Sequence, residues 1–228
     1  MKKALLRYLG YMSFAALTAY ALLYFSGVVP DKLLLDFTVD QYQTSEFSPV
    51  EQLQHAFLLV CSVIFFWIAS RDRLRRPMAI GWATLFMLFL VRELDYVFDT
   101  YLADNVWEAV SAVILAFSGV YIYRHSDRFV NGWRRSWPSA GLGIALGGLI
   151  LLVPFTQVVV SSTLWAAVMD ENYVRAAKVA AEELMELGAY LLMLIGSVEF
   201  MYSWSRLPQT RLIGALPKRK RRQRKRRS

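Results

Sequence analysis

Five ionisable side chains could together bind a cation, and each lies within or at the edge of a long apolar segment: Glu51, His55, Glu93, Glu183 and Glu186. Carboxylates with one imidazole suit Zn²⁺, Mn²⁺ or Fe²⁺, whereas carboxylates alone suit Ca²⁺ or Mg²⁺. Ionisable groups inside a membrane are functional candidates because their burial in lipid is costly. The residues therefore predict a proton or cation site, with a divalent metal ion as the candidate cofactor.

These groups are expected in one thin layer. Along a helix that rises about 1.5 Å per residue, His55 lies about 24 Å from Arg71, and Glu93 lies about 26 Å from Arg76. Because the hydrocarbon core of a bilayer is about 30 Å thick, both lie near the boundary opposite these arginines. Four supporting residues join the layer by the same measure: Arg92, Asp95, Glu108 and Glu182. Carboxylates outnumber cations there, so protons, a bound cation or water must relieve the excess charge.

Local structural roles compete with this hypothesis. Ser48-Pro49-Val50-Glu51 has the pattern of a helix capping box, and Asn105 and Glu108 have the same spacing. Lys178 can pair with Glu182 one helical turn away. The other members of the candidate site have no obvious partner on their own segment. A structural hydrogen-bond network between helices is therefore as compatible with the sequence as a cation site.

The apolar segments that carry these residues predict an all-α, polytopic membrane bundle. Of the 228 residues, 56% are hydrophobic and 19% are charged, against about a quarter charged in soluble domains. A helix needs about 20 apolar residues to cross a bilayer. We predict six transmembrane helices within residues 1–205, at 8–29, 51–70, 77–99, 105–123, 138–160 and 174–205. The first apolar stretch is too long for a signal peptide, and we expect it to remain as an anchor.

Basic residues predict the orientation of the bundle. The N-terminus, the loops at 71–76 and 124–135 and the residues after 205 together hold 22 basic and 2 acidic residues. The rest of the chain holds 4 basic and 16 acidic residues. By the positive-inside rule, both termini are expected in the cytoplasm, and a bacterial inner membrane is the expected location.

The C-terminal residues 206–228 predict a disordered, polybasic cytoplasmic tail, because self-repulsion prevents a compact form. Its basic residues are Lys218, Arg219, Lys220, Arg221, Arg222, Arg224, Lys225, Arg226 and Arg227. Anionic lipid head groups are the expected partner, at about 1 kcal/mol for each basic residue near the surface. Nucleic acid fits less well, because no aromatic residue interleaves the run for base stacking. A protein partner or an oligomer is also compatible with the sequence.

Several residues inside the predicted spans indicate how the helices pack. Gly143 and Gly147 are four residues apart in the predicted fifth span, which favours close approach of a neighbouring helix. Pro154 can kink the same span. Glu199 lies about 10 Å inside the inner boundary and is expected to meet an arginine or another polar helix face. Cys61 is expected to be a small buried core residue.

Three functions remain compatible with these features. The first is a cation or proton site that acts in transport or sensing, although the apolar middle of the bundle counts against transport. The second is a scaffold with a structural polar layer and a partner-binding tail. The third is a metal-dependent hydrolase that acts on lipid head groups. Two histidines exclude a three-histidine zinc site, and common hydrolase and nucleotide motifs are absent. Whether the chain is an enzyme stays open.

Overall fold

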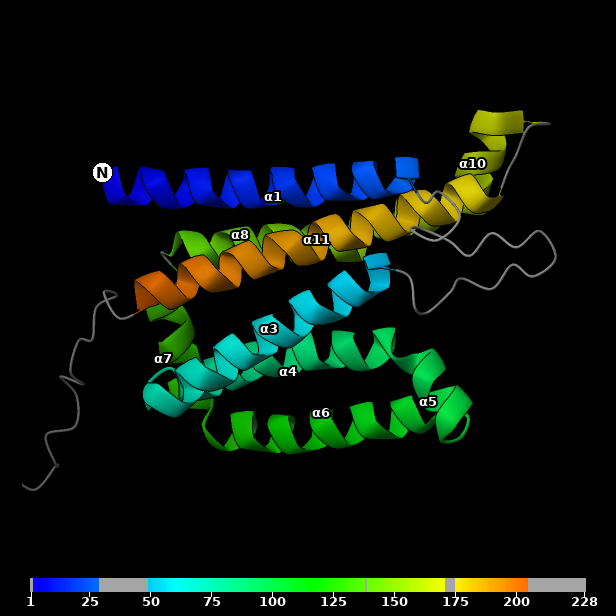
Figure 1. The fold of residues 1–228 in the computed structure, drawn as a ribbon. Helices are drawn as coiled ribbons and strands as arrows, with labels where there is room; N and C mark the ends of the chain where they lie inside the picture. The colour runs from blue at the N-terminus through cyan, green and yellow to red at the C-terminus, as the bar shows by residue number, and fades with distance from the viewer. Residues whose placement is uncertain (1, 29–48, 138, 171–174, 205–228) are drawn as a thin grey trace, which may run out of the picture.

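The computed structural model describes residues 2–28, 49–137, 139–170 and 175–204, and all regular structure among them is helical. The long helices lie side by side in one bundle (Figure 1). The predicted tail, residues 206–228, lies outside the described residues, and so does the segment 29–48. The all-α prediction is therefore confirmed for the described part of the chain.

The first half of the bundle contains α1 (Lys2–Val28), α3 (Pro49–Arg71), α4 (Arg76–Glu93), α5 (Asp95–Tyr101) and α6 (Val106–Arg124). The second half contains α7 (Ser126–Ser136), α8 (Ala140–Ile150), the π-helical turn η1 (Leu151–Phe155), α9 (Thr156–Val160), α10 (Ser162–Met169) and α11 (Arg175–Ser203). Pro154 lies inside η1, so the predicted disturbance of the fifth span is a widened helical turn at this proline.

Four of the described helical stretches are long and apolar enough to cross a membrane: Val50–Arg71, Val106–Arg124, Ala140–Val159 and Lys178–Ser203. A fifth stretch qualifies if α4 and α5 are counted as one bent span. α1 covers residues 8–28 of the segment predicted as the first span, 8–29, but it is not among these candidate stretches. The structure therefore supports a membrane protein, with four to five candidate spans by length and composition.

The segment predicted as one continuous span, 77–99, is broken. α4 ends at Glu93, α5 begins at Asp95, and the two helices meet at an angle of 53°. At the break, the Asp95 carboxylate accepts a hydrogen bond from the backbone N–H of Tyr96. This bond competes with regular helix formation, as short acidic side chains often do. The segment predicted as the third span therefore consists of two helices, and it remains a candidate span if the bent pair is counted as one.

The core of the bundle is formed where α11 packs against α8 and α3, and where α3 packs against α4. α6 and α7 in turn pack against α4. Phe65 of α3 lies at the centre, with its ring 5.5 Å from that of Phe200 and 5.7 Å from those of Trp82 and Phe86. Cys61 is fully buried beside this aromatic group, as the sequence predicts.

Small residues bring α8 and α11 into backbone contact, but not the pair that the spacing predicts. A Cβ atom at Gly143 or Gly147 would meet nothing within 4 Å. A Cβ atom at Gly141 would lie 2.3 Å from the backbone nitrogen of Phe200, and one at Gly196 would lie 2.4 Å from that of Ala145. The backbones of α8 and α11 do approach closely, but the face of α8 in contact carries Gly141 and Ala145. The prediction that Gly143 and Gly147 make this contact is therefore wrong.

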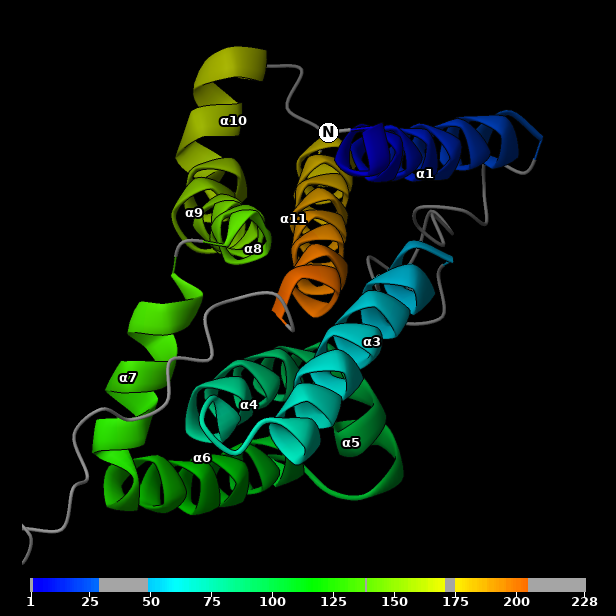
Figure 2. The ribbon, with the colours of Figure 1, turned by 90° about the vertical axis from the view of Figure 1, so that its left-hand side faces the viewer.

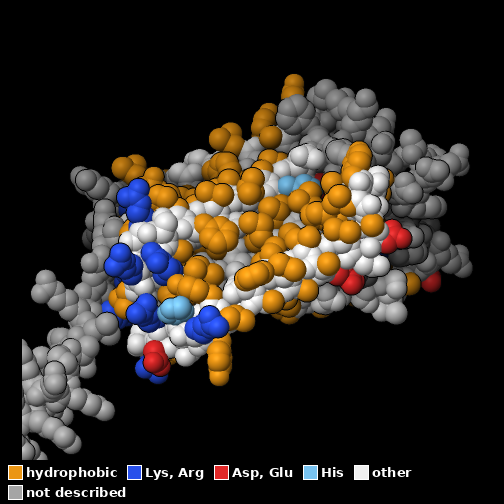
Figure 3. Space-filling view, turned by 90° about the horizontal axis from the view of Figure 1, so that it is seen from below, with side chains coloured by type: hydrophobic (Ala, Val, Ile, Leu, Met, Phe, Trp, Pro, Cys, Tyr) orange, Lys and Arg blue, Asp and Glu red, His pale blue; other side chains and the backbone are white. Residues whose placement is uncertain are grey.

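The outer surface of the bundle is banded. Figure 3 shows hydrophobic side chains across the middle of one face, with basic side chains gathered at one end and acidic side chains towards the other. α6 has no buried residue, and Phe117 on it is 75% exposed. An exposed apolar band between two charged ends is the surface that a lipid bilayer covers.

Candidate functional site

Polar side chains from three helices meet where α4 ends and α5 begins. α3 contributes Gln54 and His55, and α4 contributes Arg92 and Glu93. α11 contributes Glu183, Glu186 and Tyr190. We call these seven residues the polar cluster. It lies at the end of the bundle opposite the basic residues of the α3–α4 turn, as the layer predicted from helix depth requires.

Glu93 is bound from both neighbouring helices. The hydroxyl of Tyr190 donates a hydrogen bond of 2.7 Å to the Glu93 carboxylate. The Nε2 atom of His55 lies 3.1 Å from the backbone carbonyl oxygen of Glu93. Because a carbonyl oxygen only accepts, His55 must carry its proton on Nε2. The bond also satisfies one of the carbonyl groups that the end of α4 leaves without a helical partner.

Gln54 links α3 to α11. It is fully buried, and its Nε2 atom donates to both the carbonyl and the carboxylate of Glu183, at 3.1 and 3.0 Å. Its own Oε1 atom is buried without a hydrogen-bond partner among the described residues. Sequence reasoning missed Gln54 because it weighed only ionisable groups. The available signal was a polar residue one turn after Glu51 in an otherwise apolar segment.

Glu186 differs from Glu93 and Glu183, each of which accepts a hydrogen bond from a side chain on a neighbouring helix. Its side chain is 6% exposed, and no described residue forms a hydrogen bond or ion pair with it. It lies close enough to Glu93 and Glu183 for electrostatic repulsion and close enough to Arg92 for attraction. Arg92 is itself exposed, so its charge is partly solvated. The cluster therefore combines three neighbouring carboxylates with one arginine at its edge.

The structure brings together most of the residues predicted as ligands. His55, Glu93, Glu183 and Glu186 belong to one cluster, and Glu51 is buried in the first turn of α3, where a negative charge favours the helix end. Among the described residues, however, no group of three or more such side chains is arranged to hold a metal ion. The geometry therefore gives the divalent-metal hypothesis no support.

Of the four residues predicted to support the site, only Arg92 lies in the polar cluster. Arg92 joins the cluster, whereas Asp95 bonds the backbone of α5. Glu108 is exposed on α6, and Glu182 is half-buried on α11. The predicted cap at Asn105 is wrong, because this residue adopts a left-handed φ of 66° and its side chain makes no cap hydrogen bond.

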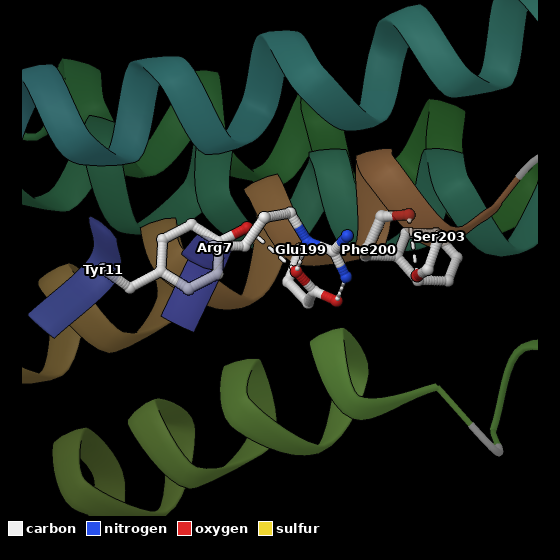
Figure 4. Close-up of polar contacts among 5 residues, drawn as sticks. All are labelled: Arg7, Tyr11, Glu199, Phe200 and Ser203. Carbon is white, nitrogen blue, oxygen red and sulfur yellow. Dashed lines mark hydrogen bonds and ion pairs between the residues drawn. The ribbon is translucent and has the colours of Figure 1, made fainter. Parts of the chain in front are cut away.

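A second polar site ties α1 to α11 (Figure 4). Arg7 donates two hydrogen bonds to the carboxylate of Glu199, at 3.0 and 2.9 Å, and Tyr11 donates a third at 2.9 Å. Glu199 is 3% exposed, so its charge is balanced at short range within the bundle. The prediction that Glu199 meets an arginine is confirmed, and the partner is Arg7.

A third polar site, which sequence reasoning missed, fixes the α3–α4 turn. Arg75 is fully buried and forms an ion pair of 2.6 Å with Asp72. Its Nε atom also donates to the hydroxyl of Ser136 at the end of α7, at 3.2 Å. A basic residue in a short loop is normally a solvated topology signal. Here α7 packs against Arg75 through Gly132 and Ser136, and the spacing of residues in the sequence does not reveal this contact.

Comparison with protein-family models, curated proteins and solved structures finds no match to this chain. In the described residues, the fold is all-helical, four to five helical stretches are long and apolar enough to cross a membrane, and buried carboxylates lie at one end of the bundle.

Proposed function

We propose that the chain is a six-span protein of a bacterial inner membrane with both termini in the cytoplasm. Counting α1 as the first span and the bent α4–α5 pair as the third gives six, in the order that the sequence predicts. The charge distribution supports the orientation, because exposed Arg73, Arg124, Arg128 and Arg134 gather at one end of the bundle.

We further propose that the polar cluster reversibly binds a proton or a small monovalent cation from the outer side, as part of a sensing or transport function. The observation that carries this proposal is the buried carboxylate of Glu186, which repels Glu93 and Glu183 and forms no ion pair within the described structure. Neighbouring carboxylates in a low dielectric cannot all stay charged without a compensating cation. Arg92 supplies one charge at the edge, and a proton or cation supplies the remainder.

A structural lock is the second candidate function. Three hydrogen bonds support it, from Gln54 to Glu183, from Tyr190 to Glu93 and from His55 to the end of α4. Each bond joins two different helices, so the cluster would hold α3, α4 and α11 together. The two candidates differ in whether Glu186 exchanges a proton or cation while the protein stays folded.

Infrared difference spectroscopy distinguishes the two candidates. The full-length protein in lipid nanodiscs would be stepped between acidic and alkaline buffer, and the carbonyl band of protonated carboxyl groups would be followed. If the polar cluster binds a proton, the carboxyl band should change with pH. If it binds a cation, added Na⁺ or K⁺ should remove the proton and weaken the band. In both cases the change should be lost in Glu186→Gln. Glu108→Gln, on exposed α6, is the matched control and should leave that band in place. An unchanged band in Glu186→Gln would refute the binding proposal and leave the lock.

Two further measurements test the remaining parts. Mass spectrometry of the purified protein would detect a stoichiometric transition metal, and its loss in His55→Ala would restore the metal hypothesis. Reporter fusions test the six-span proposal. A reporter that is active only in the cytoplasm should be active when it is fused after Arg128. A reporter that is active only after export should be active when it is fused after Asp104. The opposite pattern at either position would contradict the topology.

A further inference from the structure

α7 lies across the basic end of the bundle, between the end of α6 and the start of α8. Figure 2 shows α7 close to its full length, while α8 and α11 are seen nearly end-on. One face of α7 is fixed to the α3–α4 turn. Gly132 on this face is so close that an added Cβ would lie 3.3 Å from the Cα of Arg75, and Ser136 accepts the hydrogen bond from Arg75. α7 is therefore an ordered helix with a defined buried side.

The exposed residues of α7 include two arginines. Arg128 lies one turn before Gly132, Arg134 lies on the side away from Gly132, and both are exposed, as is Arg124 at the adjoining end of α6. None of the three arginines forms an ion pair with an acidic group in the described part of the chain. Asp127 is exposed nearby, but the basic groups outnumber it. This surface, defined by Arg124, Arg128 and Arg134, is here called the α7 arginine surface.

Large apolar side chains flank the α7 arginine surface. Trp137 is 57% exposed just after α7, and Tyr123 is 84% exposed just before it. Val130 is also exposed, between Arg128 and Arg134. A helix that lies across the ends of the spans and combines exposed arginines with aromatic and apolar groups has the composition of an interfacial membrane helix. Arginine also matches phosphate geometry through its planar array of N–H donors.

We propose that the α7 arginine surface binds the phosphates of anionic phospholipid head groups in the leaflet next to the basic end of the bundle. The charge of the arginines complements these phosphates, and the flanking Trp137 and Tyr123 contact the adjoining apolar region. This site belongs to the folded bundle, and it is distinct from the basic tail at residues 218–227. It is also independent of the polar cluster, which lies at the other end.

Lipid selectivity of the full-length protein tests the proposal. The protein would be equilibrated in mixed micelles that contain equal amounts of phosphatidylglycerol and phosphatidylcholine, and the bound lipids would be quantified by mass spectrometry. Each arginine near an anionic surface strengthens the attraction by about fivefold, so Arg128→Gln with Arg134→Gln should reduce the preference for phosphatidylglycerol by roughly 25-fold. The preference in the unchanged protein should also weaken as salt screens the charges.

Control variants separate charge at α7 from charge elsewhere. Arg128→Lys with Arg134→Lys retains the charge and should keep most of the preference, which excludes unfolding as the cause of a loss. Lys178→Gln removes one charge at the other end of the bundle and should have no effect, whereas Arg134→Gln alone should reduce the preference. Deletion of 218–228 should leave the contribution of α7 intact.

Three outcomes would overturn the proposal. The first is an unchanged preference for phosphatidylglycerol in the doubly substituted glutamine variant. The second is complete loss of the preference on deletion of 218–228, which would assign lipid binding to the tail. The third is binding of an RNA oligonucleotide through Arg128 and Arg134 with no preference between the two lipids.

Discussion

Substitution of Gly196 by alanine tests the closest contact in the bundle. The added Cβ would lie 2.4 Å from the backbone nitrogen of Ala145 and 2.7 Å from the carbonyl oxygen of Gly141. Both atoms belong to the backbone of α8, so no side-chain rotation can relieve the overlap. The two helices would have to separate by on the order of 1 Å, and a gap of that size forfeits about a quarter to a half of the dispersion energy between facing atoms.

The expected cost follows from this separation. Overpacking of a well-packed core typically costs about 1–3 kcal/mol, and we expect Gly196→Ala to reduce the free energy of unfolding by about 2 kcal/mol or more. Gly188→Ala is the matched control on the same helix, because a Cβ there meets nothing within 4 Å. That change should be neutral or stabilising, by up to about 1 kcal/mol, since alanine favours a helix more than glycine does.

Equilibrium unfolding in mixed micelles of mild detergent and dodecyl sulfate would measure both variants, with helical circular dichroism as the signal. Gly141→Ala and Gly143→Ala repeat the comparison on α8, where the first should destabilise and the second should not. Equal free energies of unfolding for Gly196→Ala and Gly188→Ala, within about 0.5 kcal/mol, would refute the α8–α11 contact described above.

Three further predictions concern the polar sites. Arg75→Met should cost about 2–4 kcal/mol in unfolding experiments because it strips Asp72 and Ser136 of a buried partner, whereas Arg73→Met at the exposed neighbouring position should stay within about 0.5 kcal/mol. Arg7→Leu should lower the thermal midpoint more than Arg7→Leu combined with Glu199→Leu, because the single change leaves a buried charge without its ion-pair partner; the reverse order would contradict a buried ion pair. Tyr190→Phe should cost about 1–3 kcal/mol and shift the infrared titration of the polar cluster, and an unaltered titration would mean that its hydrogen bond to Glu93 does not form.

Local composition was sufficient to predict much of the fold. The apolar runs predict helices because a segment of that length and hydrophobicity must satisfy its own backbone hydrogen bonds in lipid. This constraint acts within each segment, so α3, α6, the stretch from α8 to α9 and α11 were found from the sequence to within a few residues at their ends. The break after Glu93 was missed because residues 94–99 contain neither proline nor glycine, and only the backbone geometry reveals it.

Helix depth likewise predicted which ionisable residues lie near the same end of the bundle. His55, Glu93, Glu183 and Glu186 lie at a similar level because distance along a helix depends only on residue number. Their partners could not be predicted in the same way. Gln54 and Tyr190 face the carboxylates because of how each helix is rotated about its own axis, and that rotation is set by the packing of all its neighbours.

The sequence by itself therefore determined that the described segments are helical, that several of these helices suit a membrane and that Glu93, Glu183 and Glu186 lie near the same end, because each property is local. Only the tertiary structure decided that α8 meets α11 through Gly141 rather than Gly143, since the two faces of that helix have nearly the same composition. It also decided that Arg75 is buried while Arg73 is exposed, because the fold of the turn, and not the residue type, selects which arginine meets Asp72.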